Sequence, residues 1–275
     1  MVLVAGSALY LAITWLAVIA WDIFDLFGWQ GAAAYCPQSW NLLWICLFRE
    51  AGPTEVLQWT LLATSVLIAL HGRHHAWKIG NTNHAMIFML LATGLTLMLL
   101  EDSLNVRHHF TVSVLQPIWS PDPVPTTART AWEAFYYLVL ALIMLAPVLI
   151  LLRRTSPSIR VLASMGVAYA VYGLAAASSA FRYVDSAYSR LGDLLITTLP
   201  MTSANHWQHA QARIAQWHEK NPEETRTLGF YLMDMMVEES LELLGALLLL
   251  AALVQLHKFF TLNSIEPPSI TRYQG

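Results

Sequence analysis

Six stretches of apolar residues, each long enough to cross a bilayer as a helix, dominate this chain. A transmembrane helix needs about 20 consecutive apolar residues. The runs are continuous rather than alternating, which favours helices over a β-barrel. The qualifying windows are 2–21, 55–72, 84–104, 131–152, 159–181 and 229–256. The sequence therefore predicts an all-α integral membrane bundle of about six transmembrane helices, forming a single domain over residues 1–275.

The composition agrees with a bilayer as the solvent. Charged residues make up 12% and hydrophobic residues 56% of the 275 residues, whereas soluble domains carry about 25% charged residues. Too few polar side chains remain to cover a water-facing surface. The net charge of −3 gives no reason to expect a nucleic-acid partner. The first window lacks a basic flank and a cleavage site, so we expect a retained span rather than a signal peptide.

Two segments outside the six windows have a predicted structure of their own. Residues 31–48 are apolar but contain Pro37, and we expect a re-entrant or interfacial segment there rather than a seventh span. Residues near 203–219 place apolar side chains at helical spacing among polar ones, which predicts an interfacial helix on the membrane surface. A lid over a site is the alternative for this helix. Cys36 and Cys46 could form a disulfide.

Basic residues in the short connections indicate the orientation. Arg73, Lys78, Arg153 and Arg154 lie on the side of the membrane that also holds both termini, and these short loops contain no acid. Positive residues in short loops favour the cytoplasm. We therefore expect a multi-pass protein of the bacterial inner membrane with both termini in the cytoplasm. Every acidic residue except Glu266 falls toward the opposite, outer side.

The last span opens with carboxylates on one helical face. Asp234, Glu238 and Glu242 are spaced i, i+4, i+8, and Glu239 lies on the flank of that face. After Glu242 only about 14 apolar residues precede His257, roughly 21 Å of helix against a hydrocarbon core of about 30 Å. We therefore expect Glu242 to lie below the outer lipid boundary, where carboxylates are rare and are functional candidates.

Other spans bring matching groups to the same level. Glu101, Asn105 and His108 would share one face if the third span continued as a helix. Glu133 lies in the first turn of the fourth span, and Glu55 in the first turn of the second. Both of these acids could also be ordinary helix-start residues that interact with the helix dipole.

Together these residues predict a metal site toward the outer face. Carboxylates from several helices, with an imidazole, are the ligands of metal sites inside helical bundles. The candidate ligands are Glu101, His108, Glu238 and Glu242. The residues expected to support or bridge them are Asp102, Glu133, Asp234 and Glu239. This donor set suits iron, manganese or zinc, although the Glu-x-x-His spacing of ferritin-like di-iron proteins is absent.

Three histidine pairs or triplets resemble the boxes of membrane desaturases and hydroxylases. They are His71-Gly-Arg-His74-His75, Asn105-Val-Arg-His108-His109 and His206-Trp-Gln-His209. Those enzymes need all boxes on one membrane face, and one span separates the first set from the other two. We therefore expect residues 71–75 to be basic interfacial residues, with a lone cytoplasmic metal site as the alternative.

Three short motifs resemble a group of uncharacterised bacterial membrane proteins. They are Glu50-Ala-Gly-Pro53-Thr-Glu55, the pair Glu101-Asp102 at the end of a middle span, and Glu238-Glu239-Ser-Leu-Glu242 followed by Gly245. The resemblance implies no known activity. The pair His108-His109 departs from the pattern of that group.

The leading hypothesis is an integral membrane metalloprotein, acting as a metal-dependent enzyme on a lipid or lipophilic substrate near the outer side. A non-catalytic subunit of a larger membrane complex remains open as a second hypothesis, and a proton or cation transporter as a third. Trp29, Tyr35, Trp40 and Trp44 could dock a protein partner or form an interfacial aromatic belt. Membrane lipid is the expected partner under all three hypotheses.

Overall fold

The computed structural model describes residues 2–24, 26, 42–49, 51–120, 122–155, 157–182, 184–198, 207–220, 222 and 226–263. Every regular element in these ranges is helical. Most of the predicted re-entrant segment 31–48 lies outside the described residues, and so do Trp29, Tyr35, Cys36 and Trp40. Cys46 is described and is disulfide-bonded.

The helices follow one another along the chain with intervening π-helical turns. Their bounds are α1 (Val2–Val18), η1 (Ile19–Ile23), α2 (Leu43–Phe48), α3 (Pro53–Lys78), α4 (Thr82–Leu104), α5 (Val106–Phe110), η3 (Thr111–Leu115), α6 (Gln116–Trp119), α7 (Thr126–Arg154), α8 (Ile159–Phe181), α9 (Asp185–Thr198), α10 (Gln208–Lys220), α11 (Leu228–Tyr231), η4 (Leu232–Val237) and α12 (Glu238–Asn263).

Six of these helical stretches are long and apolar enough to cross a membrane, which confirms the predicted number of spans. They are Val2–Ile23, Leu43–Lys78, Thr82–Leu104, Thr126–Arg154, Ile159–Phe181 and Leu228–Thr261. The observed helices extend beyond the apolar windows because polar end turns continue them. The chain is therefore a multi-pass, all-α membrane protein.

Local sequence signals set the ends of the second and third spans. Pro53 occupies the first helical turn of α3, where its missing N–H costs no hydrogen bond. Gly80 adopts a φ of 72° in the turn between α3 and α4, a left-handed conformation that glycine reaches without steric cost. Asn81 then caps α4 by accepting a hydrogen bond from the backbone N–H of His84 at 3.1 Å.

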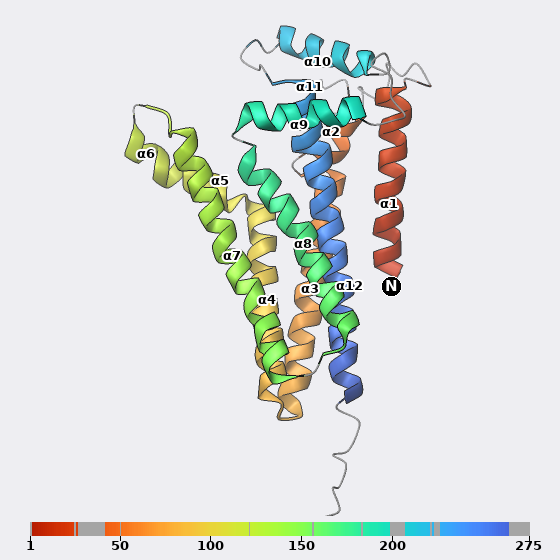
Figure 1. The fold of residues 1–275 in the computed structure, drawn as a ribbon, viewed down its shortest axis with the longest axis vertical. Helices are drawn as coiled ribbons and strands as arrows, with labels where there is room; N and C mark the ends of the chain where they lie inside the picture. The colour runs from red at the N-terminus through yellow and green to blue at the C-terminus, as the bar shows by residue number, and fades with distance from the viewer. Residues whose placement is uncertain are drawn as a thin grey trace, which may run out of the picture.

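Four long helices form the centre of the bundle. α3 packs against α4 and α12, and α12 packs against α8, while α7 covers α4 and α1 stands beside α12 (Figure 1). The turns that join α3 to α4 and α7 to α8 lie at one end, which we call the turn end. The opposite end carries α2, α5, α6, α9 and α10, and we call it the capped end.

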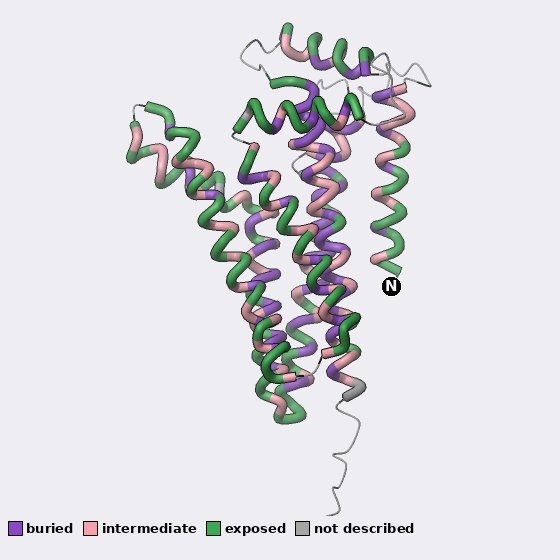
Figure 2. Tube along the Cα trace, viewed as in Figure 1, coloured by how far each residue is buried: buried purple, intermediate pink, exposed green. Residues whose placement is uncertain are grey.

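Apolar side chains fill the interior and also cover the outside. One buried cluster lies between α3, α4, α8 and α12, and a second lies beneath α9 and α10. The outer faces of α1, α7 and α8 are exposed along most of their length (Figure 2). Large apolar residues occupy these faces, among them Leu9, Leu16, Leu138, Leu142 and Leu174. A surface of this kind requires hydrocarbon around it.

The helix predicted near 203–219 is present as α10, which lies across the capped end (Figure 1). Its apolar residues Ala210 and Ile214, with Trp207 just before it, are buried against the second cluster. The indole of Trp44 lies 6.4 Å from that of Trp207 and is fully buried. Trp44 is therefore a core residue, and the prediction that it belongs to a docking surface or an aromatic belt is wrong.

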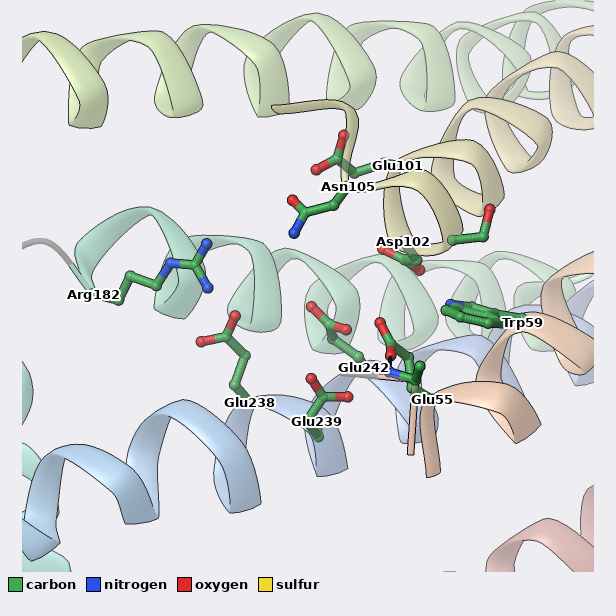
Figure 3. Close-up of a pocket in the computed structure, with 11 residues that line it drawn as sticks. Glu55, Trp59, Glu101, Asp102, Asn105, Arg182, Glu238, Glu239 and Glu242 are labelled. Carbon is green, nitrogen blue, oxygen red and sulfur yellow. Dashed lines mark hydrogen bonds between the residues drawn. The ribbon is translucent and has the colours of Figure 1, made fainter. Parts of the chain in front are cut away.

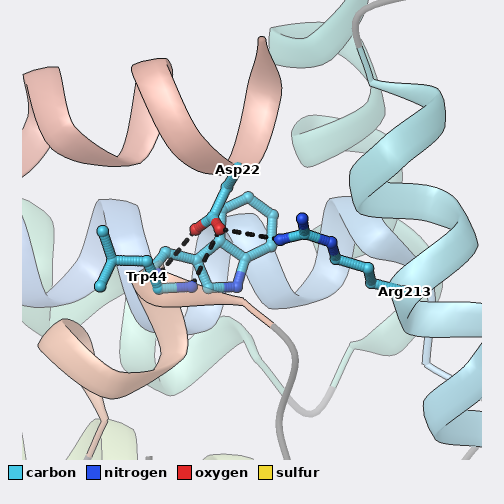
Figure 4. A network of polar contacts seen from close by, with 4 residues as sticks. Asp22, Trp44 and Arg213 are labelled. Carbon is cyan, nitrogen blue, oxygen red and sulfur yellow. Dashed lines mark hydrogen bonds and ion pairs between the residues drawn. The ribbon is translucent and has the colours of Figure 1, made fainter. Parts of the chain in front are cut away.

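Asp22 ties three elements together at the capped end. Its carboxylate oxygens accept hydrogen bonds from the backbone N–H groups of Leu43 at 2.9 Å and Trp44 at 2.8 Å, which satisfies the first turn of α2. The same side chain forms an ion pair with Arg213 of α10 at 3.5 Å (Figure 4). Asp22 is 1% exposed. One buried carboxylate thus holds α10 over α2 and the end of the first span.

Candidate functional site

An acidic cavity of about 180 Å³ lies near the capped end, between the ends of α3, α4, α8 and α12. Its lining residues carry six carboxyl groups and one guanidinium. They are Ala51, Glu55, Trp59, Glu101, Asp102, Ser103, Asn105, Arg182, Glu238, Glu239 and Glu242 (Figure 3). The three short motifs noted in the sequence, which are far apart in the chain, meet at this one place.

The start of α12 supplies three of the carboxyl groups. Glu238, Glu239 and Glu242 point from this helix toward the side chains of α4 (Figure 3). Asp234 does not line the cavity, contrary to the predicted i, i+4, i+8 face. The reason is that residues 232–237 form the π-helix η4, whose wider turn rotates Asp234 relative to the helix that follows. Glu239, predicted to lie on the flank, takes part instead.

The end of α4 supplies Glu101 and Asp102, and Glu101 is buried. The helix stops there because Asn105 adopts a left-handed conformation with a φ of 47°, which asparagine tolerates better than most residues. The predicted continuous face from Glu101 to His108 is therefore broken. Asn105 lines the cavity, whereas His108 lies exposed on α5 and contacts His109. In this structure His108 does not line the cavity with the acids.

A sharp turn before α3 delivers Glu55 to the cavity. Ala51 has a positive φ of 56°, and a Cβ atom on Gly52 would lie 2.6 Å from the carbonyl oxygen of Arg49. The Glu55 carboxylate accepts a hydrogen bond from the backbone N–H of Ala51, a favourable position for an acid at a helix start. Glu133 of α7 is also buried but does not line the cavity.

A buried amide and a buried phenol hold two of the acids in place. Nε2 of Gln58, a fully buried residue of α3, donates to Asp102 Oδ2 at 2.7 Å and to Glu242 Oε2 at 3.1 Å. The hydroxyl of Tyr172 of α8 donates to the same oxygen of Asp102 at 2.7 Å. Three spans and the last helix are thereby joined by hydrogen bonds to two carboxylates, which are stronger than bonds between neutral groups.

Glu238 has a separate set of partners. The hydroxyl of Tyr188, on the surface helix α9, donates to Glu238 Oε2 at 2.6 Å, and Ser178 lies 3.1 Å from that hydroxyl. Burial raises the pKa of Tyr188 well above its usual range, and the neighbouring carboxyl group of Glu238 raises the pKa further. Tyr188 is therefore a fixed proton donor. The guanidinium of Arg182 points toward Glu238 across the cavity (Figure 3).

Several polar atoms in and beside the cavity are buried without a hydrogen-bond partner among the described residues. They are Glu239 Oε2, Trp59 Nε1 and Gln58 Oε1. Buried polar atoms of native proteins normally have a partner, which is either protein, water or a ligand. Glu239 and Trp59 belong to the lining itself. These two lining atoms are available to a polar occupant of the cavity.

The donors that line the cavity fit some cations better than others. No group of three or more His, Cys, Asp or Glu within the described ranges is placed to hold a metal ion directly. With His108 outside, the lining offers carboxylate and amide oxygens. Oxygen donors suit magnesium, calcium and manganese rather than zinc. A cation that keeps part of its water shell, bound through one or two carboxylates, fits this arrangement.

Comparison of the chain with models of protein families, with curated proteins and with solved structures finds no match in any of the three.

The histidines of the first box lie in the last turns of α3, at the turn end (Figure 1), whereas Glu55 in the first turn of the same helix lines the acidic cavity. The ring of His257 of α12 is 5.5 Å from that of His71 and 6.5 Å from that of His75, between ring centroids. His74 is exposed. His108 and His109 lie at the capped end on α5, so the two sets cannot share a pair of metal ions.

Sequence reasoning missed the residues that position the acids. Gln58, Tyr172 and Tyr188 were not assigned a role, because a single polar residue inside or beside an apolar span has no pattern of its own. One signal was present for Gln58: it follows Glu55 by three residues, so the two side chains lie on the same face of α3.

Proposed function

We propose that this chain is an integral membrane metalloprotein that binds a hydrated divalent cation in the acidic cavity and acts on a lipid or lipophilic substrate. One observation carries the proposal. Six carboxyl groups from three spans surround one cavity that contains one guanidinium, and Glu55, Glu101 and Glu238 are each less than 10% exposed.

Repulsion among the carboxylates favours a bound cation. Carboxylates crowded beneath the lipid boundary repel one another, and burial of uncompensated charge costs several kcal/mol per ion, on the order of the stability of a whole domain. A divalent cation removes both costs. Of the three metals expected from the sequence, manganese agrees best with a lining of oxygen donors. A bound cation of this kind polarises a substrate oxygen or activates water.

The position of the site supports an extracytoplasmic location. Arg153 and Arg154 end α7 and Lys78 ends α3, all at the turn end, and basic residues beside short loops favour the cytoplasm. The capped end then faces the periplasm of a bacterial inner membrane, with both termini in the cytoplasm. The disulfide of Cys46 in α2 supports this orientation, because disulfides persist in oxidising compartments.

The alternatives receive less support. A transporter needs polar groups between the two ends, but the buried positions of α12 between Glu242 and His257 are apolar, as at Leu243, Ala246 and Leu250. Trp44 does not belong to a docking surface on the aromatic segment, because it packs in the core. Co-purification of a stoichiometric partner that carries the activity would favour the subunit hypothesis.

The direct test is manganese binding by the purified protein in lipid nanodiscs, measured by electron paramagnetic resonance and by elemental analysis. We expect stoichiometric Mn²⁺ in the wild type and its loss in a Glu238→Gln/Glu242→Gln variant. Glutamine keeps the shape of each side chain, and a thermal melt without metal checks that the variant is folded.

The matched control is Glu219→Gln, which removes an exposed acid on α10 outside the cavity. This variant is expected to bind Mn²⁺ as the wild type does. Absence of Mn²⁺ from the wild type, or undiminished binding in the double variant, would overturn the proposal.

A further inference from the structure

A second cavity, apolar and larger than the first, lies directly below the acidic one toward the middle of the spans. It has a volume of about 280 Å³ and lies between α4, α7, α8 and α12. Leu140 and Met144 of α7, Tyr169 and Gly173 of α8 and Leu249 of α12 form much of its wall. This cavity is distinct from the acidic site, but it shares Tyr172 with the network that holds the acids.

The apolar cavity opens to the surrounding hydrocarbon. Leu145 of α7 is 44% exposed and also lines the cavity, and Gly173 of α8 is exposed as well. Both residues lie inside their spans, so the medium that reaches them is lipid. The opening therefore runs sideways between α7 and α8 and admits molecules from within the bilayer.

The glycine keeps this opening clear. A Cβ atom on Gly173 would meet no atom within 4 Å outside its own stretch of helix, so the space beside it is unfilled. An apolar cavity of about 150 Å³ is enough to bind benzene. The larger volume here, about 280 Å³, accommodates on the order of a dozen carbon atoms by the same measure. That matches part of one hydrocarbon chain and not a whole two-chain lipid.

Two tyrosines give the cavity a direction. The hydroxyl of Tyr172 donates to Asp102 at the edge of the acidic cavity. Tyr169, one turn nearer the turn end, lines the opposite part of the wall. The polar head of an occupant therefore belongs at the Tyr172 end, beside the acids, and its hydrocarbon tail belongs toward Tyr169.

We propose that the apolar cavity binds one acyl chain of a bilayer lipid, which enters between α7 and α8, with the polar head toward the acidic cavity. This names the substrate class of the acidic site and in that respect rests on the proposed function. Binding of the chain itself depends only on the apolar cavity.

The test uses phosphatidylcholine that carries a photoactivatable diazirine on its acyl chain, in nanodiscs containing the full-length protein. Mass spectrometry of peptides locates the label. We expect labelling inside the cavity, at residues such as Met144 and Leu249, in addition to nonspecific labelling of the outward-facing Leu138.

Gly173→Phe fills the cavity and is expected to lower the internal labelling about tenfold, the effect of roughly 1.4 kcal/mol of binding free energy. Gly166→Phe is the matched control. Gly166 lies two turns away on the same face of α8, is outside the cavity, and also has open space where a Cβ atom would be. It is expected to leave internal labelling unchanged.

If Gly173→Phe does not fold, Ala141→Phe fills the cavity from α7 and replaces it in the test. Internal labelling that persists in the filled variant, or label confined to Leu138 in the wild type, would overturn the inference. Mn²⁺ binding is measured on the same samples and is expected to survive both glycine substitutions. If the wild type did not bind Mn²⁺ but internal labelling was intact, the result would contradict the proposed function and would still support the acyl-chain site.

Discussion

Tyr172 links the two cavities: its hydroxyl donates at 2.7 Å to Oδ2 of Asp102, which lines the acidic cavity, and Tyr172 itself lines the apolar cavity. Gly245 of α12 makes this position available. A Cβ atom on Gly245 would lie 2.7 Å from the Tyr172 ring and 3.2 Å from the Tyr172 Cα atom. The glycine that follows the acidic motif therefore lets α8 approach α12 closely enough for the phenol to reach the acids.

Tyr172→Phe removes one donor to Asp102 and leaves the ring in place. We expect a loss of about 1–3 kcal/mol in the free energy of unfolding, the cost of depriving a partly buried acceptor of a hydrogen bond. Thermal and denaturant unfolding in detergent measures it. The comparison is Tyr169→Phe. The Tyr169 hydroxyl has no hydrogen-bond partner within the described ranges, and its removal is expected to change stability little. An equal loss in both variants would show that the bond to Asp102 contributes nothing.

Tyr188→Phe is expected to destabilise the protein near neutral pH, because Glu238 loses the donor at 2.6 Å. The effect has a pH dependence. Burial raises the pKa of Tyr188 in the folded protein above the unfolded value of about 10. The contribution of the Tyr188 hydroxyl to the free energy of unfolding is therefore complete below about pH 10 and is lost as the pH rises further.

Unfolding measured from pH 7 to 11 tests this dependence. The wild type is expected to lose stability above about pH 10 relative to Tyr188→Phe. Ser178→Ala, which removes the neighbour of Tyr188 but keeps the bond to Glu238, is expected to cost less than Tyr188→Phe at pH 7. If the difference in free energy of unfolding between the wild type and Tyr188→Phe stayed constant up to pH 11, the prediction would be contradicted.

Asp22→Ala removes the cap of α2 and the ion pair to α10 together. We expect it to lower the free energy of unfolding by about 2–4 kcal/mol. Arg213→Ala removes the ion pair and keeps the cap of α2. Its side chain is 19% exposed, and the expected cost is about 1 kcal/mol. A double-mutant cycle isolates the coupling, and limited proteolysis reports whether α10 detaches. A coupling energy of zero would mean that the contact does not hold α10.

Gly192→Ala tests the packing of α9 against α11. A Cβ atom on Gly192 would collide with the backbone of Gly229, so even alanine forces the two helices apart. We expect a loss of about 1–3 kcal/mol and weaker positioning of Tyr188, which lies on the same helix. Gly166→Ala on α8 meets no neighbour, and it is expected to stabilise the protein by about 0.5–1 kcal/mol through helix propensity. Stabilisation by both substitutions would rule out the close approach of Gly192 to Gly229.

The spans were predictable because the bilayer allows few alternatives to a long apolar helix. The convergence of Glu101, Glu238 and Glu242 was predictable for a related reason, since each acid lies near the same end of its span. The differences from the expected arrangement came from breaks in regular helix geometry. The left-handed Asn105 interrupts the face that runs from Glu101 toward His108, and Asp234 lies in a π-helical turn and does not line the cavity.

Positioning residues could not be found from one sequence. Gln58 and Tyr172 are single polar side chains inside apolar spans, and their contacts depend on how α3 and α8 are rotated about their axes. That rotation is set by packing details such as the absence of a side chain at Gly245, which periodicity does not report.

The apolar core that separates the acidic cavity from His257 has an electrical consequence. Charges that cross the membrane gain or lose about 2.3 kcal/mol per 100 mV, and the buried side chains of α12 between Glu242 and His257 are apolar. We therefore expect ions and protons to reach the acidic cavity from the capped end. Its occupancy is expected to follow the salt and acidity of the solution on that side and to be indifferent to the membrane voltage.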